Sequence, residues 1–243
     1  MKETHIFICN RDRLQPLEKL VEILLKCGYF NIVILDNQST YEPLLKWYDT
    51  LKETSVVVHR CKENYGHTSL DRCLEYEDDF RLQYQKVLST QYFVYTDSDV
   101  VPIDEIPENF IDDMIEMSKK HNISKLGLSL KIDDLPDHFM YKKEVIEWEK
   151  QFFSSVAVED ANCVLYRAAV DTTFAVHRPG MSCGYRGDAF RTGGNYFARH
   201  YPWYYNTANL PEDELHYCYN LGSSGHWSNL VKNAINDKNT HNS

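Results

Sequence analysis

The chain has 243 residues, of which 43% are hydrophobic and 26% are charged, a composition typical of soluble globular proteins. Its 26 lysines and arginines against 36 aspartates and glutamates give a net charge of −10, which disfavours binding to nucleic acid. No stretch approaches the roughly 20 apolar residues that cross a bilayer, and residues 1–13 are too polar for a signal peptide. We therefore expect a cytoplasmic protein with no transmembrane segment.

The seven cysteines are scattered along the chain without a close pair. Zinc ribbons and secreted disulfide scaffolds instead repeat short cysteine spacings. We therefore expect reduced thiols, most of them buried.

Short apolar runs alternate with amphipathic segments through the first part of the chain. Strands are predicted at residues 4–9, 31–35, 55–59 and 92–95, and helices at residues 14–27 and 41–51. Gly28 stands where the first helix should end. This alternation predicts crossover connections and a largely parallel sheet.

The pattern changes after Pro102. Helices are predicted at residues 109–122 and 141–153, and strands at residues 125–130, 164–166 and 172–176, with the last two strands expected to be antiparallel. Residues 179–209 are rich in glycine, arginine and aromatic residues with little periodicity, and residues 237–243 suggest a frayed tail. Without a repeat or a linker, the chain reads as one α/β domain with a small antiparallel part in its second half.

Polar residues follow each of the four strands predicted in the first part. They are Asn10 and Arg11, Asp36 and Asn37, Asn64 and Gly66, and the pair Asp97 and Asp99. Because ligands of open α/β sheets bind at the carboxyl ends of the strands, we expect these residues to converge on one cleft. Two carboxylates one residue apart can both approach a divalent ion that bridges a diphosphate.

Four segments with these polar ends resemble the family-2 inverting glycosyltransferases of the GT-A fold. They are Phe7-Ile8-Cys9-Asn10-Arg11, Ile34-Leu35-Asp36-Asn37-Gln38-Ser39, Glu63-Asn64-Tyr65-Gly66 and Tyr95-Thr96-Asp97-Ser98-Asp99. The resemblance implies a single GT-A domain with a Rossmann-like, mostly parallel central sheet flanked by helices. Residues 1–102 would bind a nucleotide sugar and residues 103–236 an acceptor.

The resemblance also implies roles for the residues of the first half. Asn10 and Arg11 would line the nucleotide pocket, and Asp36 would contact the base or ribose, although an aspartate there is also a routine turn or cap residue. Asn64 would lie in a loop closing over the nucleotide. Arg72 would offset phosphate charge or be an ordinary surface arginine.

The metal site implied by the resemblance centres on the acid pair. Asp97 would approach the ribose or the metal, with Ser98 beside it in the pocket, and Asp99 would ligate Mn²⁺ or Mg²⁺. His200 could complete the metal shell, since imidazole can join carboxylates around manganese, or could simply pack among aromatic residues. Trp203 could stack on a sugar or fill the core.

Inverting transfer needs a carboxylate to deprotonate the acceptor hydroxyl. The candidates are Asp171, Asp188 and the acids of residues 212–214, with Asp213 preferred and Asp171 second. Pro211 could begin a helix there, and acids in its first turn would also be favoured by the helix dipole.

These observations predict a metal-dependent glycosyltransferase that moves a sugar from a nucleoside diphosphate sugar, with UDP as the expected nucleotide, to a glycan or lipid-linked acceptor. Inversion is expected, although retention stays open. A sugar nucleotidyltransferase is the first alternative, but the run Asn10-Arg11-Asp12-Arg13 contains no glycine for a phosphate loop. A non-catalytic sugar-binding module is the second. The glycine motifs of dinucleotide-binding and P-loop proteins are absent from the sequence.

Overall fold

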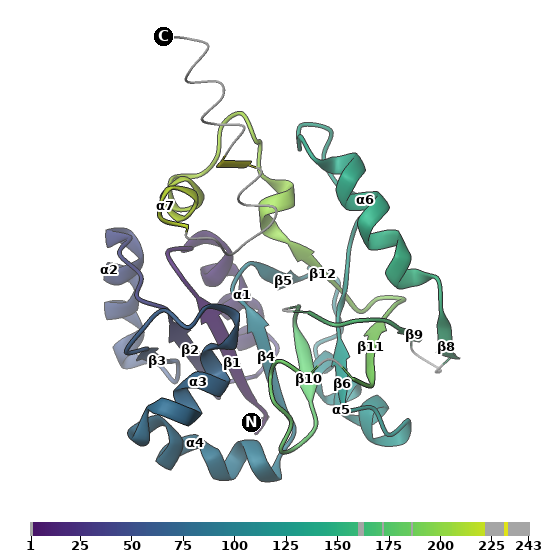
Figure 1. The fold of residues 1–243 in the computed structure, drawn as a ribbon, viewed down its shortest axis with the longest axis horizontal. Helices are drawn as coiled ribbons and strands as arrows, with labels where there is room; N and C mark the ends of the chain where they lie inside the picture. Colours follow the sequence, from purple (N-terminus) through teal and green to yellow (C-terminus); the bar gives the residue numbers. More distant parts are fainter. Residues whose placement is uncertain (1, 160–162, 172, 186, 222–230, 233–243) are drawn as a thin grey trace.

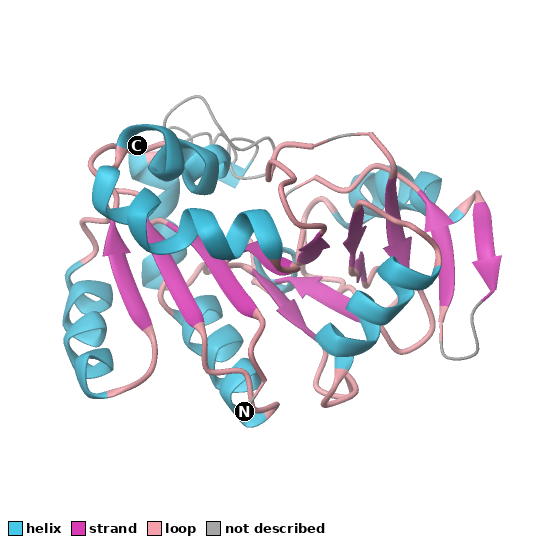
Figure 2. Cartoon of the chain, turned by 90° about the horizontal axis from the view of Figure 1, so that it is seen from below, coloured by secondary structure: helices cyan, strands magenta, loops and turns pink. Residues whose placement is uncertain are grey.

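The chain folds around one long sheet, with helices on both of its faces (Figures 1 and 2). The structure, a computed structural model, describes residues 2–159, 163–171, 173–185, 187–221 and 231–232. The tail predicted at residues 237–243 lies outside these residues. In the part of the chain described here, no helix is long and apolar enough to cross a membrane.

The first part of the chain has the predicted alternation of strands and helices. Its elements are β1 (His5–Asn10), α1 (Gln15–Lys26), β2 (Ile32–Asp36), α2 (Glu42–Thr50), β3 (Val57–Arg60), α3 (Ser69–Tyr76), α4 (Asp78–Thr90) and β4 (Phe93–Asp97). The predicted elements are confirmed to within two residues at each end. Helices α3 and α4 fill a segment for which the sequence analysis made no helix assignment. Gly28, with φ +81°, follows α1 as expected.

The nine-stranded sheet has the strand order β3-β2-β1-β4-β10-β6-β11-β9-β8 (Figure 1). Strands β3, β2, β1 and β4 are mutually parallel, whereas β10 is antiparallel to both β4 and β6. The chain moves from β1 to β2 and β3 on one side and reaches β4 on the other. The strand order therefore reverses between β1 and β4, and such a switch point is where open α/β sheets bind ligands.

Alternate side chains of the central strands enter two different cores. On β1, Ile6 and Ile8 pack with residues of α1, α2 and α5, whereas Phe7 packs with Phe80 and Tyr84 of α4. This is the period-two pattern of a strand covered on both faces. It explains why these strands read as continuous apolar runs.

The second half supplies the rest of the large sheet and a small second sheet. Its elements are β5 (Val100–Pro102), α5 (Phe110–Lys120), β6 (Lys125–Gly127), β7 (Ser129–Leu130), α6 (Lys142–Lys150), β8 (Val156–Glu159), β9 (Val164–Arg167), β10 (Ala175–His177), β11 (Ala189–Thr192), β12 (Phe197–His200) and α7 (Glu212–Asn220). The small sheet has the order β5-β12-β7, with β12 antiparallel to β5 and parallel to β7.

Three features of the second half differ from the sequence expectation. The strand predicted at residues 125–130 is split at Leu128, because β6 joins the large sheet and β7 the small one. The segment 179–209, which shows little periodicity, contains β11 and β12, and these strands are only four residues long. Strand β9 pairs antiparallel with β11 and β8, not with β10. Strands this short cannot display a clear alternation.

All seven cysteines are free and six of them are buried, as the sequence analysis expected.

Candidate functional site

The loops that follow β1 and β4 meet at the point where the strand order reverses. Cys9 pairs with Asp97 in the parallel register, and the Ser98 N–H donates a 3.0 Å hydrogen bond to the Cys9 carbonyl. The chain after β1 turns at Asp12, which has a φ of +57°, and this turn brings Arg13 back toward the end of β4. Residues from two strand ends are therefore held together at the carboxyl edge of the sheet.

Arg13 and Asp99 form the centre of the site. The Arg13 Nη1 lies 2.7 Å from Asp99 Oδ2, and both side chains are more than 90% buried. The other side of the guanidinium makes a two-point contact with Glu214 of α7, at 2.7 and 3.0 Å. The guanidinium carbon of Arg13 lies 3.7 Å from the centre of the Tyr217 ring. Two buried carboxylates thus surround one guanidinium, which leaves an excess of negative charge.

Asp99 is held in its ionised form. Burial opposes ionisation, but the Arg13 guanidinium and then His200 outweigh it and keep the pKa of Asp99 well below its usual value. Asp99 Oδ2 faces both partners, whereas Oδ1 is buried and has no hydrogen-bond partner among the described residues. The charged oxygen Oδ1 is therefore available to a cation.

His200 reaches Asp99 through the small sheet. In the antiparallel pairing of β5 and β12, His200 lies opposite Val100, the residue after Asp99. Its Nε2 is 3.4 Å from Asp99 Oδ2, and its ring centre is 4.7 Å from that of Trp203. His200 therefore packs against an aromatic residue, as its alternative role expects, and its contact with Asp99 leaves its role as a metal ligand a prediction. Trp203 is only 2% exposed and belongs to the core.

The donor atoms fit a hard divalent cation in chemical type, because Asp97 and Asp99 supply carboxylates and His200 an imidazole. Asp97 ends β4 and is half-buried. Among the described residues, however, the ligand atoms of Asp97, Asp99 and His200 do not all lie within 4.8 Å of one another. The structure places Asp99 and His200 together, with Asp97 two residues away along the chain.

A second polar network follows β1 and β2. The Asn10 amide donates to the Tyr48 hydroxyl at 2.9 Å, and that hydroxyl donates to Asp36 Oδ1 at 3.0 Å. Asp36 Oδ2 lies 3.0 Å from Arg60 Nε and accepts the Ser39 N–H. Asp36 is fully buried, and by accepting the Ser39 N–H its carboxylate stabilises the turn after β2, which is the turn role given above as the alternative.

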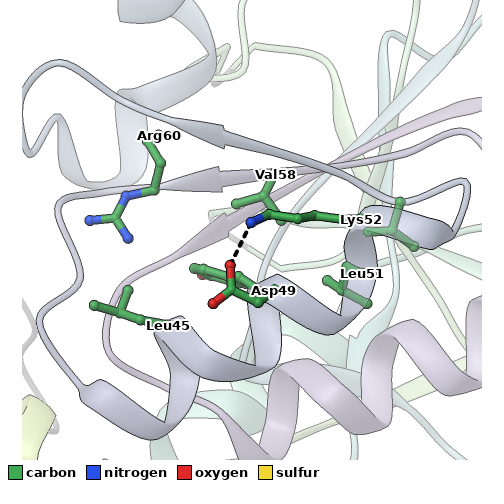
Figure 3. A pocket seen from close by; sticks show the side chains of 8 residues that line it. Leu45, Asp49, Leu51, Lys52, Val58 and Arg60 are labelled. Atoms are coloured by element: carbon green, nitrogen blue, oxygen red, sulfur yellow. Dashed lines mark ion pairs between the residues drawn. The ribbon is translucent and has the colours of Figure 1, made fainter.

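A pocket of about 470 Å³ borders this network, between α2 and β3. Tyr48 and Arg60 belong to both. Aliphatic side chains of α2, β3 and their connection form much of its wall, and the Asp49–Lys52 ion pair, at 2.8 Å, lies beside them (Figure 3). Arg60 lies at one end of the pocket (Figure 3), and its guanidinium is the group that contacts Asp36.

Arg11 lies beside Asp12 rather than beside the acid pair. Its Nε is 3.7 Å from Asp12 Oδ2, and its side chain is 25% exposed. Asp12 Oδ1 accepts the N–H groups of Thr40 and Tyr41 at 2.6 and 2.9 Å, directly before α2. The loop after β1 is therefore fixed to the start of α2.

Asp213 has a well-defined structural role. Its Oδ2 accepts the N–H groups of Leu14 and Gln15, at 2.9 and 2.8 Å, at the start of α1. Its Oδ1 accepts the Glu214 N–H at 3.0 Å, and its side chain is buried. Asp213 thus caps α1 from a helix about two hundred residues later in the chain, next to the Arg13–Glu214 contact. As expected, Pro211 precedes that helix.

Three predicted site residues lie away from this cluster. Asn64 is exposed, and its side chain accepts the Gly66 N–H at 3.1 Å within its own turn. Arg72 is exposed on α3 and pairs with Glu75 at 2.8 Å, the surface arrangement given as its alternative. Asp171 is exposed in the loop before β10; because Ala175 pairs with Tyr95, that loop lies at the same edge as Asp97.

Sequence reasoning missed Arg13, Tyr48 and Tyr217, and it considered Glu214 only as a possible base. The run Asn10-Arg11-Asp12-Arg13 offered two arginines, and nothing local distinguished the one that turns toward β4. The left-handed turn at Asp12 makes that distinction, and it is a feature of the folded backbone.

No protein-family model and no curated protein matches the chain. Among solved structures, S. aureus TarS (residues 1–349) is similar with a TM-score of 0.44 and 15% identity, over 73% of this chain and 47% of that one. This chain spans about half the length of that TarS chain. Another TarS structure, in complex with UDP-GlcNAc, has a TM-score of 0.37 with 16% identity, over 57% of this chain and 38% of that one.

A nucleotide-bound structure of HddC from Yersinia pseudotuberculosis gives a TM-score of 0.42 with 13% identity, over 78% of this chain and 83% of that one. All three TM-scores are below 0.5, so we draw no conclusion about this chain's function from these similarities.

Proposed function

We propose that the chain is a metal-dependent glycosyltransferase of the family-2, GT-A type, which transfers a sugar from a nucleoside diphosphate sugar to a glycan or lipid-linked acceptor with inversion. One observation supports this proposal above the others. An ionised, buried aspartate, Asp99, lies at the carboxyl edge of the sheet where the strand order reverses, two residues after a second acid, Asp97.

The charges around Asp99 suit an acidic ligand that arrives with a cation. The site contains more carboxylates than guanidinium groups, so a bare diphosphate would be repelled. Asp97 and Asp99 would hold Mn²⁺ or Mg²⁺, with His200 beside them. When bound, such an ion stabilises the negative charge on the departing diphosphate. Arg13 keeps Asp99 ionised and fixes its orientation, while Glu214 and Tyr217 hold Arg13.

The polar ends of β1, β2 and β3 would bind the rest of the donor, with UDP as the proposed nucleotide. Asn10 has a buried amide oxygen without a hydrogen-bond partner among the described residues, which suits a ligand N–H or hydroxyl. Arg11 follows Asn10 in the chain, and the Ser98 N–H is hydrogen-bonded to the carbonyl of Cys9, the residue before Asn10. Asp36 would have to exchange its bond to Tyr48 or Arg60 for one to the base or ribose. Asn64 and Arg72 would engage only after the loop after β3 moves inward.

Inversion requires a base on the acceptor side of the site. We retain Asp213 as the first candidate and Asp171 as the second. Asp213 lies beside the Arg13 cluster but already accepts three N–H groups, whereas Asp171 is exposed at the same sheet edge. A base must have an oxygen available to the acceptor hydroxyl, so the cap bonds of Asp213 are the main obstacle to its assignment.

The two halves of the chain would divide the work within one domain. Residues 1–102 would bind the donor and residues 103–236 the acceptor. The seven free cysteines suit a reducing compartment, and we therefore place the reaction in the cytoplasm.

Incubation of the protein with UDP-, GDP- and dTDP-sugars plus Mn²⁺ tests this proposal. A glycosyltransferase releases the nucleoside diphosphate, slowly to water or faster with an oligosaccharide acceptor. Pyrophosphate release from a nucleoside triphosphate and a sugar phosphate would instead identify a nucleotidyltransferase. Sugar binding without turnover or metal dependence would identify a binding module. Either result would refute the proposal.

A further inference from the structure

Four potential metal ligands gather between the end of β3 and helix α3, away from the Asp99 cluster. His59 lies on β3, and Cys61 is the first residue after that strand. Cys73 lies on α3, and Glu77 is the first residue after that helix. His59 Nε2 is 2.8 Å from Glu77 Oε2, and Cys73 Sγ is 3.7 Å from Glu77 Oε1. Cys61 Sγ is 3.5 Å from Cys73 Sγ.

This grouping stands out from the other acidic and histidine-containing surfaces of the protein. Within the described ranges, His59, Cys73 and Glu77 form the one set of three such residues whose ligand atoms all lie within 4.8 Å of one another. We propose that His59, Cys61, Cys73 and Glu77 bind one Zn²⁺ ion. Two thiolates, an imidazole and a carboxylate are ligands that zinc prefers.

The local structure explains why these four side chains converge. His59 and Cys61 are two residues apart in extended chain, so they point to the same side of the strand. Cys73 lies in the last turn of α3, and Glu77 directly follows that helix with its carboxylate turned back to the Cys73 thiol. The two pairs therefore face each other and would supply the four ligands of a tetrahedral site.

Two of the observed separations are close to those of a tetrahedral zinc site, and the ligand atoms of His59, Cys73 and Glu77 all lie within 4.8 Å of one another. Zinc–ligand bonds of about 2.0 to 2.3 Å place two thiolates about 3.8 Å apart and a thiolate and a carboxylate about 3.6 Å apart. The corresponding separations here are 3.5 and 3.7 Å. The His59–Glu77 contact would have to open by about 0.6 Å, from the length of a hydrogen bond to that of two ligands on one ion. Cys61 would rotate inward to complete the set.

Burial fits a closed structural site. Cys61, Cys73 and Glu77 are at most 3% exposed, which leaves no coordination position for a substrate. Because cysteine ligates zinc as the thiolate, a bound Zn²⁺ ion would be surrounded by two thiolates, one carboxylate and a neutral imidazole.

The ion would join the two ends of the segment 62–72. That segment contains the turn of residues 63–66, and its Tyr65 N–H donates a 3.0 Å hydrogen bond to Asn37 after β2. If the proposed function holds, zinc would therefore fix the base of the loop that closes over the nucleotide. The zinc site itself does not depend on that function.

Metal analysis of the purified full-length protein tests the zinc site without any activity assay. Protein purified without chelators should contain about one zinc per chain, and the variants Cys73→Ala and His59→Gln should lose most of it. Cys27→Ala is the matched control, since Cys27 is a buried cysteine remote from α3, and it should keep the zinc. His59 is 23% exposed, so His59→Gln should fold even if Cys73→Ala does not.

Titration of the chelator-treated wild-type protein with Co²⁺ provides a second measurement. A tetrahedral site with thiolates should give intense visible d–d bands and sulfur-to-cobalt charge-transfer bands at one equivalent, and zinc should then displace the cobalt. Wild-type protein that is folded by circular dichroism but holds no zinc and gives no cobalt bands would overturn the proposal. A Cys61–Cys73 disulfide detected by mass spectrometry of unreduced protein would also overturn it.

Discussion

Removal of Arg13 is the most informative single change to the stability of this fold. In Arg13→Met, Asp99 and Glu214 would keep their burial but lose the guanidinium that contacts both of them. Breaking a buried ion pair in this way typically costs about 3–5 kcal/mol of unfolding free energy. We expect a loss of about this size at pH 7, because two carboxylates are left without a cation, and the contact with Tyr217 is lost as well.

The loss should depend on pH in a defined direction. In the wild type the pKa of Asp99 is lowered, so its contribution to stability is present above the unfolded value near 3.8 and lost as pH falls through the folded value. In Arg13→Met, burial without the guanidinium would raise the pKa of Asp99, so the variant would lose more stability as pH rises. The difference between the two proteins should therefore shrink from pH 7 toward pH 4.

Urea unfolding followed by circular dichroism between pH 4 and 8 would measure this difference. Lys150→Met removes one partner of an exposed ion pair with Glu147, and it should cost on the order of 0.5 kcal/mol or less. A cost below about 1 kcal/mol for Arg13→Met, or one that does not change with pH, would contradict our view of the cluster as a buried charge network.

Changes at three further positions should have defined effects. His177 is fully buried, and burial lowers its pKa to about 3. The unfolding free energy of the wild type should therefore fall by up to about 1.4 kcal/mol per pH unit as pH drops from about 6.5 toward 3. In urea titrations at several pH values, His177→Phe should show a smaller dependence of this free energy on pH. Asp213→Ala should destabilise the protein by about 1–2 kcal/mol because α1 loses its cap. Asp213→Asn, which keeps an acceptor oxygen, should lose transfer activity if Asp213 is the base and retain it if Asp213 only caps. Gly127→Ala should lower the unfolding free energy by about 1–3 kcal/mol, since its Cβ would lie 2.7 Å from a Val170 methyl group. An unchanged melting temperature would contradict this prediction and show that Val170, in the loop before β10, moves aside at little cost.

Local sequence patterns were sufficient to predict the parallel half of the sheet. Strands such as β1 and β2 are buried on both faces and bounded by polar turns, so they appear as short apolar runs. The acid pair Asp97 and Asp99 was also readable, because its position after a strand places it at the sheet edge.

The partners of Asp99 were not readable in the same way. Glu214 lies 201 residues from Arg13 in the chain, and His200 reaches Asp99 only because β12 pairs with β5. No local periodicity encodes these contacts. The cap provided by Asp213 has the same origin, since a carboxylate at the start of α7 also suits its own helix and gives no sign of serving α1.

The cluster around Cys73 shows a related limit. Its proposed ligands come from a strand end and a helix, with eleven residues between Cys61 and Cys73, so no short cysteine spacing reveals it. Only the packing of α3 against the end of β3 brings the two pairs together.

Calorimetric titration of a UDP-sugar into the protein, with and without Mn²⁺, tests the central claim most directly. We predict binding that requires the metal, that is lost in Asp97→Asn, and that persists in Asp133→Asn, a change to an exposed acid elsewhere. Asp97 is preferred to Asp99 here because Asp99 also pairs with Arg13, so its removal would disturb the fold. Equal affinity with and without Mn²⁺, or binding unchanged in Asp97→Asn, would contradict the assignment of the acid pair to a cation that anchors the nucleotide.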